Sequence, residues 1–319
     1  MTFQQLTYLI EISKCGSINK AAQHLFLSQS GISTSIHDLE EELGITFFER
    51  TNRGVVFTAE GKEFLSYANS LLEQKQWIED LYKNKDSDDT GTVSLSIASL
   101  RYPFTDAAFI EYIKTRMGKR FRYLLKEEEV DTLIEDVATH HADIGILFLT
   151  GYPNHIVRHM IISRKLEIHK LCEARPSVYV RKGHPLTRSK EVDASELPKF
   201  PYLAFEHEQS LAADFLEEYQ TPDMKHNRQY ISISERLLNY QVLRETDCYT
   251  TGSGLLLPNQ ASDGILSIPI KGEPPLELCW ISPPVNQLPE TVWDFLEILK
   301  KKLTESLEYT EMLREKYLE

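Results

Sequence analysis

The 319-residue sequence predicts an α/β protein that begins with a small helical unit and continues into a long helix and a two-lobed region. Three observations carry this prediction. Short helical patterns between residues 3 and 43 precede two β runs joined by a turn-forming segment. A three-four apolar rhythm then starts at residue 59 and continues to residue 82. From residue 92, apolar runs of period two alternate with helical ones, which is the pattern of βαβ units.

The formal net charge of −13 argues against a protein that coats nucleic acid non-specifically. It does not exclude a DNA reader, which needs only a local basic footprint. No run approaches the ~20 apolar residues of a membrane helix, and no basic start is followed by an apolar core. We therefore expect a cytoplasmic protein without membrane contact.

The sequence predicts neither a metal, nor a cofactor, nor an enzymatic site. The four cysteines are far apart, with no C-x-x-C pair and no His at ligand spacing, so buried free thiols are expected and a redox pair is the alternative. His140 and His141 are adjacent on a predicted helix end and point in different directions, which disfavours a metal site with Asp143. G-x-S-x-G, P-loop and G-x-G-x-x-G motifs are absent.

The first three helices follow from caps and apolar spacing. Thr2 and Gln5 form a capping-box pattern that starts a helix almost at the first residue. A short second helix follows Ser17. Ser28 is a candidate N-cap for a third helix, whose apolar stripe steps by four, three and four through Ile32, Ile36, Leu39 and Leu43.

The opposite face of the third helix carries short hydrogen-bonding side chains instead of the usual Lys/Glu mixture: Gln29, Ser30, Ser33, Thr34 and His37. Such a face on the second helix of a helix-turn-helix suits base-edge and phosphate contacts in a major groove. The alternative is a helical hairpin with a polar face and no DNA. Arg50 and Arg53 flank a turn-forming segment, residues 51–54, that predicts a wing.

This stretch resembles the DNA-binding domain of the LysR-type transcriptional regulators. The matching residues are Ser17, Ala21, Ala22, Leu25, Ser28, Gln29, Ile32, Ser33, Ile36, Leu39, Glu40, Leu43, Gly44, Phe48, Arg50, Arg53, Thr58 and Gly61. The resemblance implies a winged helix-turn-helix over residues 1–58, with DNA contacts from Ser28, Gln29, Ser30, Ser33, Thr34, His37, Arg50 and Arg53. For the two arginines, a solvated turn is the alternative.

Two departures from the family pattern concern the third helix. Ser30-Gly31 stands where members commonly have Pro or Ser followed by Ala, and Gly inside a helix costs about 1 kcal/mol relative to Ala. Thr34 stands where many members carry Arg, which removes one common contact. Residues 1–90 also hold eight Lys and Arg against fourteen Asp and Glu. We therefore expect weak non-specific DNA affinity and a reliance on a few placed contacts and on dimerisation.

The long helix carries an apolar stripe that needs a partner: Phe64, Ala68, Leu71, Ile78 and Tyr82. The resemblance implies a linker helix, within residues 59–90, that pairs two subunits. Packing against its own domain is the alternative. Residues 84–91 are polar and turn-rich, which predicts a hinge.

Residues 91–303 are predicted to form a two-lobed domain like the periplasmic binding proteins, and they resemble the effector domain of the same family. Strands are expected at 92–98, 121–125, 143–148, 177–181, 202–205, 230–232, 253–257, 265–269 and 277–281, with helices at 104–117, 130–140, 211–219, 235–244 and 291–303. Lobe I takes residues 91–165 and 268–303, and lobe II takes 166–267. We expect residues 92–303 to fold alone, with residues 304–319 as a helical extension of no assigned function.

A small molecule is expected between the lobes, at strand ends that face helix N-termini. The resemblance places Ser99, Arg101, Glu206, Ser234 and Thr251 there. Hydroxyls and a guanidinium suit an organic anion, although Arg101 has Glu128 as an alternative partner.

The leading hypothesis is a sequence-specific transcriptional regulator whose activity a small-molecule effector modulates. Its expected partners are a pseudo-palindromic double-stranded operator, the effector, further copies in a homodimer or homotetramer, and RNA polymerase. A cytoplasmic small-molecule binding protein without a regulatory role is the alternative, and an enzyme on the two-lobe fold comes third.

Overall fold

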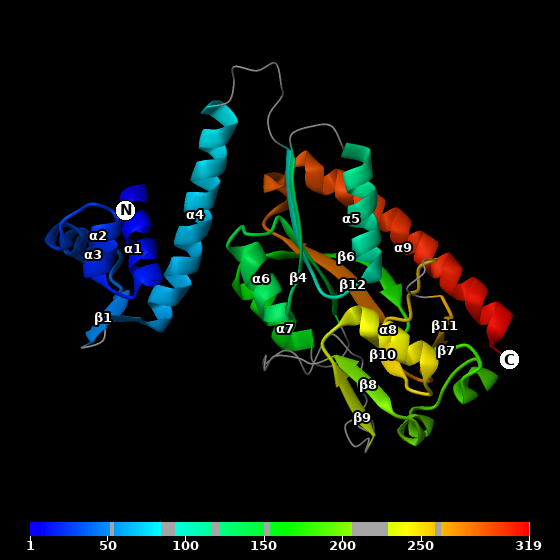
Figure 1. Cartoon of the computed structure of the whole chain (residues 1–319). Coiled ribbons are helices and arrows are strands. Elements are labelled where there is room, and N and C mark those ends of the chain that lie inside the picture. Colours follow the sequence, from blue (N-terminus) through cyan, green and yellow to red (C-terminus); the bar gives the residue numbers. More distant parts are fainter. Residues whose placement is uncertain are drawn as a thin grey trace. The chain divides into compact units, whose positions relative to one another are not determined.

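The computed structural model describes residues 1–51, 54–83, 93–116, 121–149, 154–205, 229–258 and 263–318, which form two compact units, Met1–Thr92 and Val93–Glu319 (Figure 1). The predicted hinge at residues 84–91 and the predicted helix at 211–219 lie outside the described residues. None of the described helices combines the length and apolar character that crossing a membrane requires.

Unit 1 begins with three helices: α1 (Phe3–Cys15), α2 (Ile18–His24) and α3 (Gln29–Leu43). The predicted capping box is present, since the Thr2 hydroxyl accepts from the Gln5 N–H and the Gln5 side chain accepts from the Thr2 N–H. α1 ends at Gly16 in the left-handed conformation. The α3 stripe is buried at Ile32, Ile36 and Leu39, in one core with side chains of α1 and α2.

A two-stranded antiparallel wing follows, formed by β1 (Phe48–Thr51) and β2 (Gly54–Phe57). The wing is attached to the helices because the Val55 N–H donates to the Gly16 carbonyl at 3.0 Å. The long helix α4 (Ala59–Lys83) then packs on α1, where Ala68 is buried with Leu6 and Ile10. The predicted winged helix-turn-helix and long helix are confirmed.

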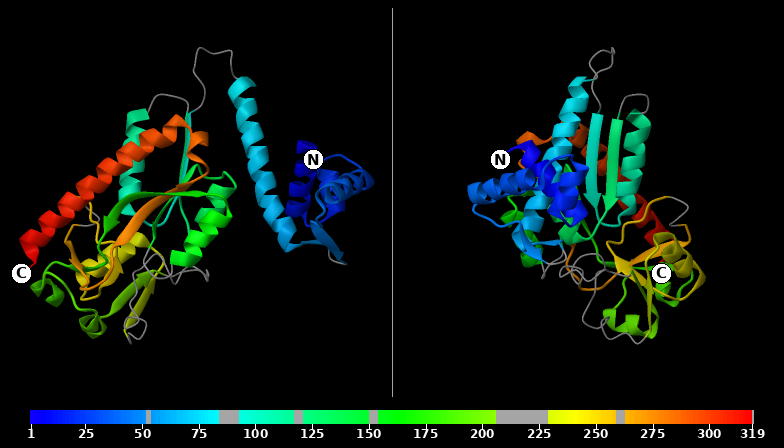
Figure 2. Two further views of the ribbon diagram at one scale, coloured as in Figure 1. Left: turned by 180° about the vertical axis from the view of Figure 1, so that it is seen from behind. Right: turned by 60° about the vertical axis from the view of Figure 1, so that its left-hand side comes forward.

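Unit 2 contains two lobes, and the first is built on a five-stranded sheet of order β4-β3-β5-β12-β6 (Figures 1 and 2). β3 is parallel to β4 and β5, as the predicted βαβαβ unit requires, and β12 is antiparallel to β5 and β6. The elements of this lobe are β3 (Val93–Ser99), α5 (Pro103–Arg116), β4 (Phe121–Glu127), α6 (Val130–Ala138), β5 (Ile144–Leu149), α7 (Asn154–Ser163), β6 (Glu167–Ala174) and β12 (Leu276–Ser282).

Lobe II holds a three-stranded antiparallel sheet of order β10-β7-β11 and a parallel pair, β8 and β9. Its elements are β7 (Ser177–Arg181), the 3-10 turns η1 (Pro185–Arg188) and η2 (Ala194–Lys199), β8 (Tyr202–Phe205), β9 (Tyr230–Ile233), α8 (Arg236–Glu245), β10 (Thr250–Gly252) and β11 (Ile265–Pro269).

Three strand predictions differ from the structure. β6 pairs with β12 in the sheet of lobe I, although the predicted boundary placed it in lobe II. β11 pairs with β7 in lobe II, whereas the sequence assigned it to a return into lobe I. In place of the strand expected at residues 253–257, the structure contains β10, which begins three residues earlier. Apolar alternation shows that a segment is extended but not which sheet it joins.

The last helix, α9 (Glu290–Tyr317), does not end at residue 303. Its first half packs on α5, with Phe295 and Leu299 in the core of lobe I. Its second half contributes Leu313 to the core of lobe II and packs on β11. Residues 304–317 are therefore part of one continuous helix that lies against both lobes of unit 2 (Figure 2).

Candidate functional site

The predicted DNA-reading face lies on α3 and is open to solvent. Gln29, Ser30, Thr34 and His37 are exposed, and Ser33 is half-buried. Ser28 is the N-cap, because its hydroxyl accepts from the Gly31 N–H at 3.1 Å and also from the Ser30 hydroxyl at 3.4 Å. With Ser28 as the N-cap, α3 begins at Gln29, and its polar face is not part of the buried core.

The structure gives a local reason for a glycine at position 31 of this helix. A Cβ built at this position would lie 3.0 Å from the Ser28 hydroxyl, which is tighter than ordinary van der Waals contact. Glycine therefore lets the capping hydroxyl sit close to the first turn, which offsets part of its unfavourable helix propensity.

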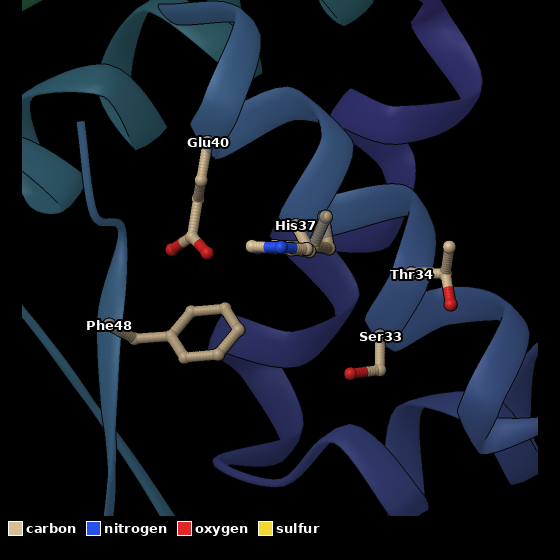
Figure 3. Close-up of a pocket in the computed structure, with 6 residues that line it drawn as sticks. Ser33, Thr34, His37, Glu40 and Phe48 are labelled. Atoms are coloured by element: carbon tan, nitrogen blue, oxygen red, sulfur yellow. The ribbon is translucent and has the colours of Figure 1, made fainter. Parts of the chain in front are cut away.

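A hollow of 280 Å³ lies between α3 and the wing, lined by Ser33, Thr34, Ile36, His37, Glu40 and Phe48 (Figure 3). Glu40 is also a positioning residue, because its carboxylate accepts from the Phe47 N–H at 2.8 Å and so ties α3 to the start of β1. His37 lies 3.5 Å from Glu41 one turn on, and both side chains are exposed. The hollow thus carries hydroxyls, an imidazole and a carboxylate on the polar side of α3.

Of the two arginines predicted for the wing, the structure describes the backbone of one. Arg50 belongs to β1, where its backbone pairs with Val55. Arg53 lies outside the described residues, as does Glu206 of the predicted effector site.

The predicted effector residues Ser99 and Thr251 are both buried, and each has a partner within its own lobe. The Ser99 hydroxyl, at the end of β3, donates to the Leu100 carbonyl at 2.8 Å and lies 3.3 Å from the Thr105 hydroxyl. Thr251 lies in β10, with its hydroxyl 3.3 Å from that of Tyr202. Ser234 is exposed and precedes Glu235, the N-cap of α8. Ser99 is thus at the end of its strand and Ser234 lies before a helix, whereas Thr251 is within its strand, and Ser99 and Thr251 already take part in local hydrogen bonds.

Arg101 pairs with Glu129 at 3.3 Å and not with Glu128, the alternative that the sequence left open. Glu128 instead lies 3.5 Å from Lys126, and its N–H donates to the Ser99 carbonyl at 3.0 Å. Burial raises the pKa of Glu128, and the neighbouring Asp136 carboxylate raises it further. The edge of lobe I beside Ser99 therefore combines one guanidinium with several carboxylates.

Arg236 is a residue of this region that the sequence analysis missed. It stands at the start of α8 in lobe II and contacts two carboxylates of lobe I, Asp106 on α5 and Glu127 at the end of β4. Burial raises the pKa of Asp106, and the Arg236 charge beside it acts in the opposite direction. The three groups join the lobes at the edge where the ligand is expected. A helix-start arginine gives no sequence signal for partners more than a hundred residues away along the chain.

Two family models match the chain. Residues 3–62 match the bacterial regulatory helix-turn-helix protein, lysR family, and residues 118–304 match the LysR substrate binding domain. The second match alone covers more than half of the sequence. The chain belongs to the LysR family.

Individual relatives agree with this assignment. The chain is 47% identical over 72 residues to the HTH-type transcriptional regulator ClcR of Pseudomonas putida, which covers 23% of this chain and 24% of that protein. It is 26% identical over 204 residues to the uncharacterized HTH-type transcriptional regulator YvbU of Bacillus subtilis, covering 64% of this chain and 65% of that protein. The chain thus spans between about a quarter and two thirds of the length of these relatives.

Among solved structures, full-length CbnR complexed with its target DNA superposes with a TM-score of 0.54 at 19% identity, covering 95% of this chain and all of that one. A full-length variant of OxyR from Pseudomonas aeruginosa gives a TM-score of 0.53 at 16% identity, with 95% and 97% covered. At these identities the likeness concerns the fold, which is the predicted combination of an N-terminal helix-turn-helix and a two-lobed α/β domain.

Proposed function

We propose that this protein is a sequence-specific transcriptional regulator that reads operator DNA with α3 and responds to a small molecule bound between its two α/β lobes. The observation that carries the proposal is the exposed polar face of α3 on a winged helix-turn-helix, in a chain that also matches the LysR substrate binding domain. We further propose that it acts in the bacterial cytoplasm as a regulator and not as an enzyme, with RNA polymerase as a partner in transcription.

The DNA-reading role is supported by the chemistry of the α3 face. Gln29 can make paired hydrogen bonds to an adenine edge, and serine hydroxyls contact bases or phosphates. The sequence of unit 1 supplies few positive charges, so specificity must come from placed contacts more than from bulk electrostatics. Glu40 ties this helix to the start of the wing through the Phe47 N–H, and we propose that Arg50 and Arg53 contact phosphate.

Truncating either Gln29 or Ser33 to alanine is expected to weaken binding to an operator selected from random duplexes by the full-length protein. A lost base contact costs about 1–3 kcal/mol, or about 5- to 150-fold in Kd. Binding to a scrambled duplex should change much less, and Gln23→Ala, an exposed glutamine on α2, is the matched control. If titration by fluorescence anisotropy gives both variants the parent's ratio of specific to non-specific affinity, α3 is not the reading helix.

We propose that a second copy pairs with the chain through α4. Leu71 and Ile78 are seven residues apart, so they lie on one face of the helix, and they are 37% and 48% exposed. Such a stripe on a helix that already packs Ala68 against α1 supports a homodimer, and a homotetramer is consistent with it. A dimer would present two α3 helices to the half-sites of a pseudo-palindromic operator.

We propose that the effector is an organic anion held near Ser99, Arg101, Ser234 and Thr251, with Glu206 as a further contact. The support is the position of Ser99 at the end of β3 and of Ser234 before α8, together with the guanidinium of Arg101.

Arg101→Ala is expected to weaken binding of a stabilising carboxylate by about 10- to 150-fold, since a hydrogen bond to a charged group contributes about 1.5–3 kcal/mol. The ligand would come from a thermal-shift screen of carboxylates and amino acids on the full chain, with its Kd measured by calorimetry. Arg122→Ala, an exposed arginine on β4, is the control. Stabilisation by neutral or cationic compounds alone, or an unchanged Kd in Arg101→Ala, would contradict an anionic effector.

A further inference from the structure

Three side chains of different chemistry converge where α1 meets α2. Glu11 and Cys15 come from α1, and His24 is the last residue of α2. The Cys15 thiol donates to Glu11 Oε1 at 3.4 Å and lies 3.6 Å from His24 Nδ1, while His24 Nδ1 lies 3.0 Å from the same Glu11 oxygen. The group thus joins two helices of the DNA-binding unit.

The spacing of the three donor atoms matches that of ligands around one tetrahedral ion. Zn–N and Zn–O bonds of about 2.0–2.2 Å and Zn–S bonds of about 2.3 Å place neighbouring ligand atoms about 3.3–3.6 Å apart. The observed separations of 3.0, 3.4 and 3.6 Å require shifts of a few tenths of an ångström at most on that scale. Glu11 and Cys15 are four residues apart on α1, which places them on one face of the helix.

We propose that Glu11, Cys15 and His24 form a binding site for Zn²⁺, with a fourth coordination position open to solvent. Thiolate, imidazole and carboxylate together suit zinc, whereas Mg²⁺ and Ca²⁺ prefer sets made of oxygen alone. Binding replaces the thiol proton by the metal, and that proton passes to solvent. The His24 side chain is 65% exposed and Glu11 is 21% exposed, which gives the ion a path of entry.

The site would act on the geometry of the helix-turn-helix. Cys15 directly precedes Gly16, whose carbonyl holds the wing through the Val55 N–H. An ion bound by both α1 and α2 would fix the junction to which the wing is attached. Because it binds the folded unit, it would raise the stability of that unit as its concentration rises above the Kd.

The experiment uses the full chain, freed of metal with a chelator, and titrates it with Co²⁺ as a spectroscopic probe. Binding through Cys15 should produce a thiolate-to-cobalt charge-transfer band and the intense visible bands of a tetrahedral ion, and Zn²⁺ should displace both. Zn²⁺ affinity is then measured by competition with a chromophoric chelator. Changes outside the ligand shell commonly cost about 10- to 100-fold in affinity, so loss of a ligand should cost about 100-fold or more.

Cys15→Ser is expected to abolish the charge-transfer band, and His24→Gln is expected to weaken Zn²⁺ binding, with circular dichroism reporting whether each variant is folded. Cys172→Ser is the matched control, because Cys172 is a half-buried thiol of unit 2 whose pKa burial raises to about 11. It should keep both the band and the affinity. The proposal is wrong if the parent binds no Zn²⁺, if its cobalt spectrum lacks the thiolate band, or if folded Cys15→Ser keeps the parent's affinity. Those results would leave a hydrogen-bonded triad only.

Discussion

A chain ended after Leu303 is expected to lose the fold of lobe II, because the second half of α9 completes its core. Leu313 and Leu318 are buried there, and Tyr309 and Tyr317 pack against the same cluster. Fully burying a side chain of this size contributes about 1.5–3 kcal/mol. Their combined loss is comparable with the ~5–15 kcal/mol net stability of a typical domain.

The truncation would also leave buried polar groups without partners. The Leu256 N–H donates to the Thr310 hydroxyl at 2.9 Å, and its carbonyl accepts from Ser306 at 2.8 Å. Arg314 donates to the Ser267 carbonyl at 3.1 Å and to the hydroxyls of Ser177 and Ser267. Each buried group left unpaired costs about 1–3 kcal/mol.

The measurement compares the full chain with a chain ending at residue 303 by soluble yield and thermal unfolding. Leu313→Ala tests the same contact without truncation and should cost about 2–5 kcal/mol. Met312→Ala, at the neighbouring residue and 49% exposed, is the control and should change stability little. A truncated chain that unfolds with the parent's midpoint and cooperativity would show that residues 304–318 are dispensable.

This expectation reverses one drawn from the sequence, which assigned residues 304–319 to an extension and allowed residues 92–303 to fold alone. The sequence of the extension has a helical pattern. That pattern does not indicate which surface of the protein its apolar face packs against. The match to the LysR substrate binding domain likewise ends at residue 304. The contacts between Arg314 and Ser177 join residues 137 positions apart, a relation that local periodicity does not report.

Sequence reasoning succeeded where the cause is local. The Thr2 capping box, the Ser28 N-cap and the α3 stripe each depend on residues within a few turns. The structure contains both caps and buries three of the four stripe residues, while Leu43 at the end of the stripe is exposed. Sequence reasoning failed where the partner residue is far away along the chain. The pairing of β6 with β12 and the contact of Arg236 with Asp106 cross long stretches of chain. Cys15 and His24 are only nine residues apart, but a helix end, a turn and a second helix bring them together, so simple ligand spacing missed them.

Gly61→Ala is expected to disrupt the junction between the wing and α4. A Cβ built on Gly61 would overlap the Phe47 carbonyl oxygen and lie 2.9 Å from the Phe47 Cα, a clash that no rotamer change relieves because these are backbone atoms. The junction is held by Thr58, whose hydroxyl donates to the Thr46 carbonyl at 2.7 Å and accepts from the Gly61 N–H at 2.9 Å. The first turn of α4 and the start of the wing cannot separate without breaking these bonds.

We expect a cost at or above the upper end of the ~1–3 kcal/mol that overpacking usually brings. Hydrogen exchange of the full chain should become faster across residues 46–64, and operator affinity should fall because Glu40 then no longer fixes α3 against the wing through the Phe47 N–H. Glu63→Ala, an exposed residue in the same turn of α4, is the control and should leave exchange unchanged. Parent-like protection and parent-like DNA binding in Gly61→Ala would mean that the backbone at Phe47 can move away at little cost, and that Gly61 serves some purpose other than close approach.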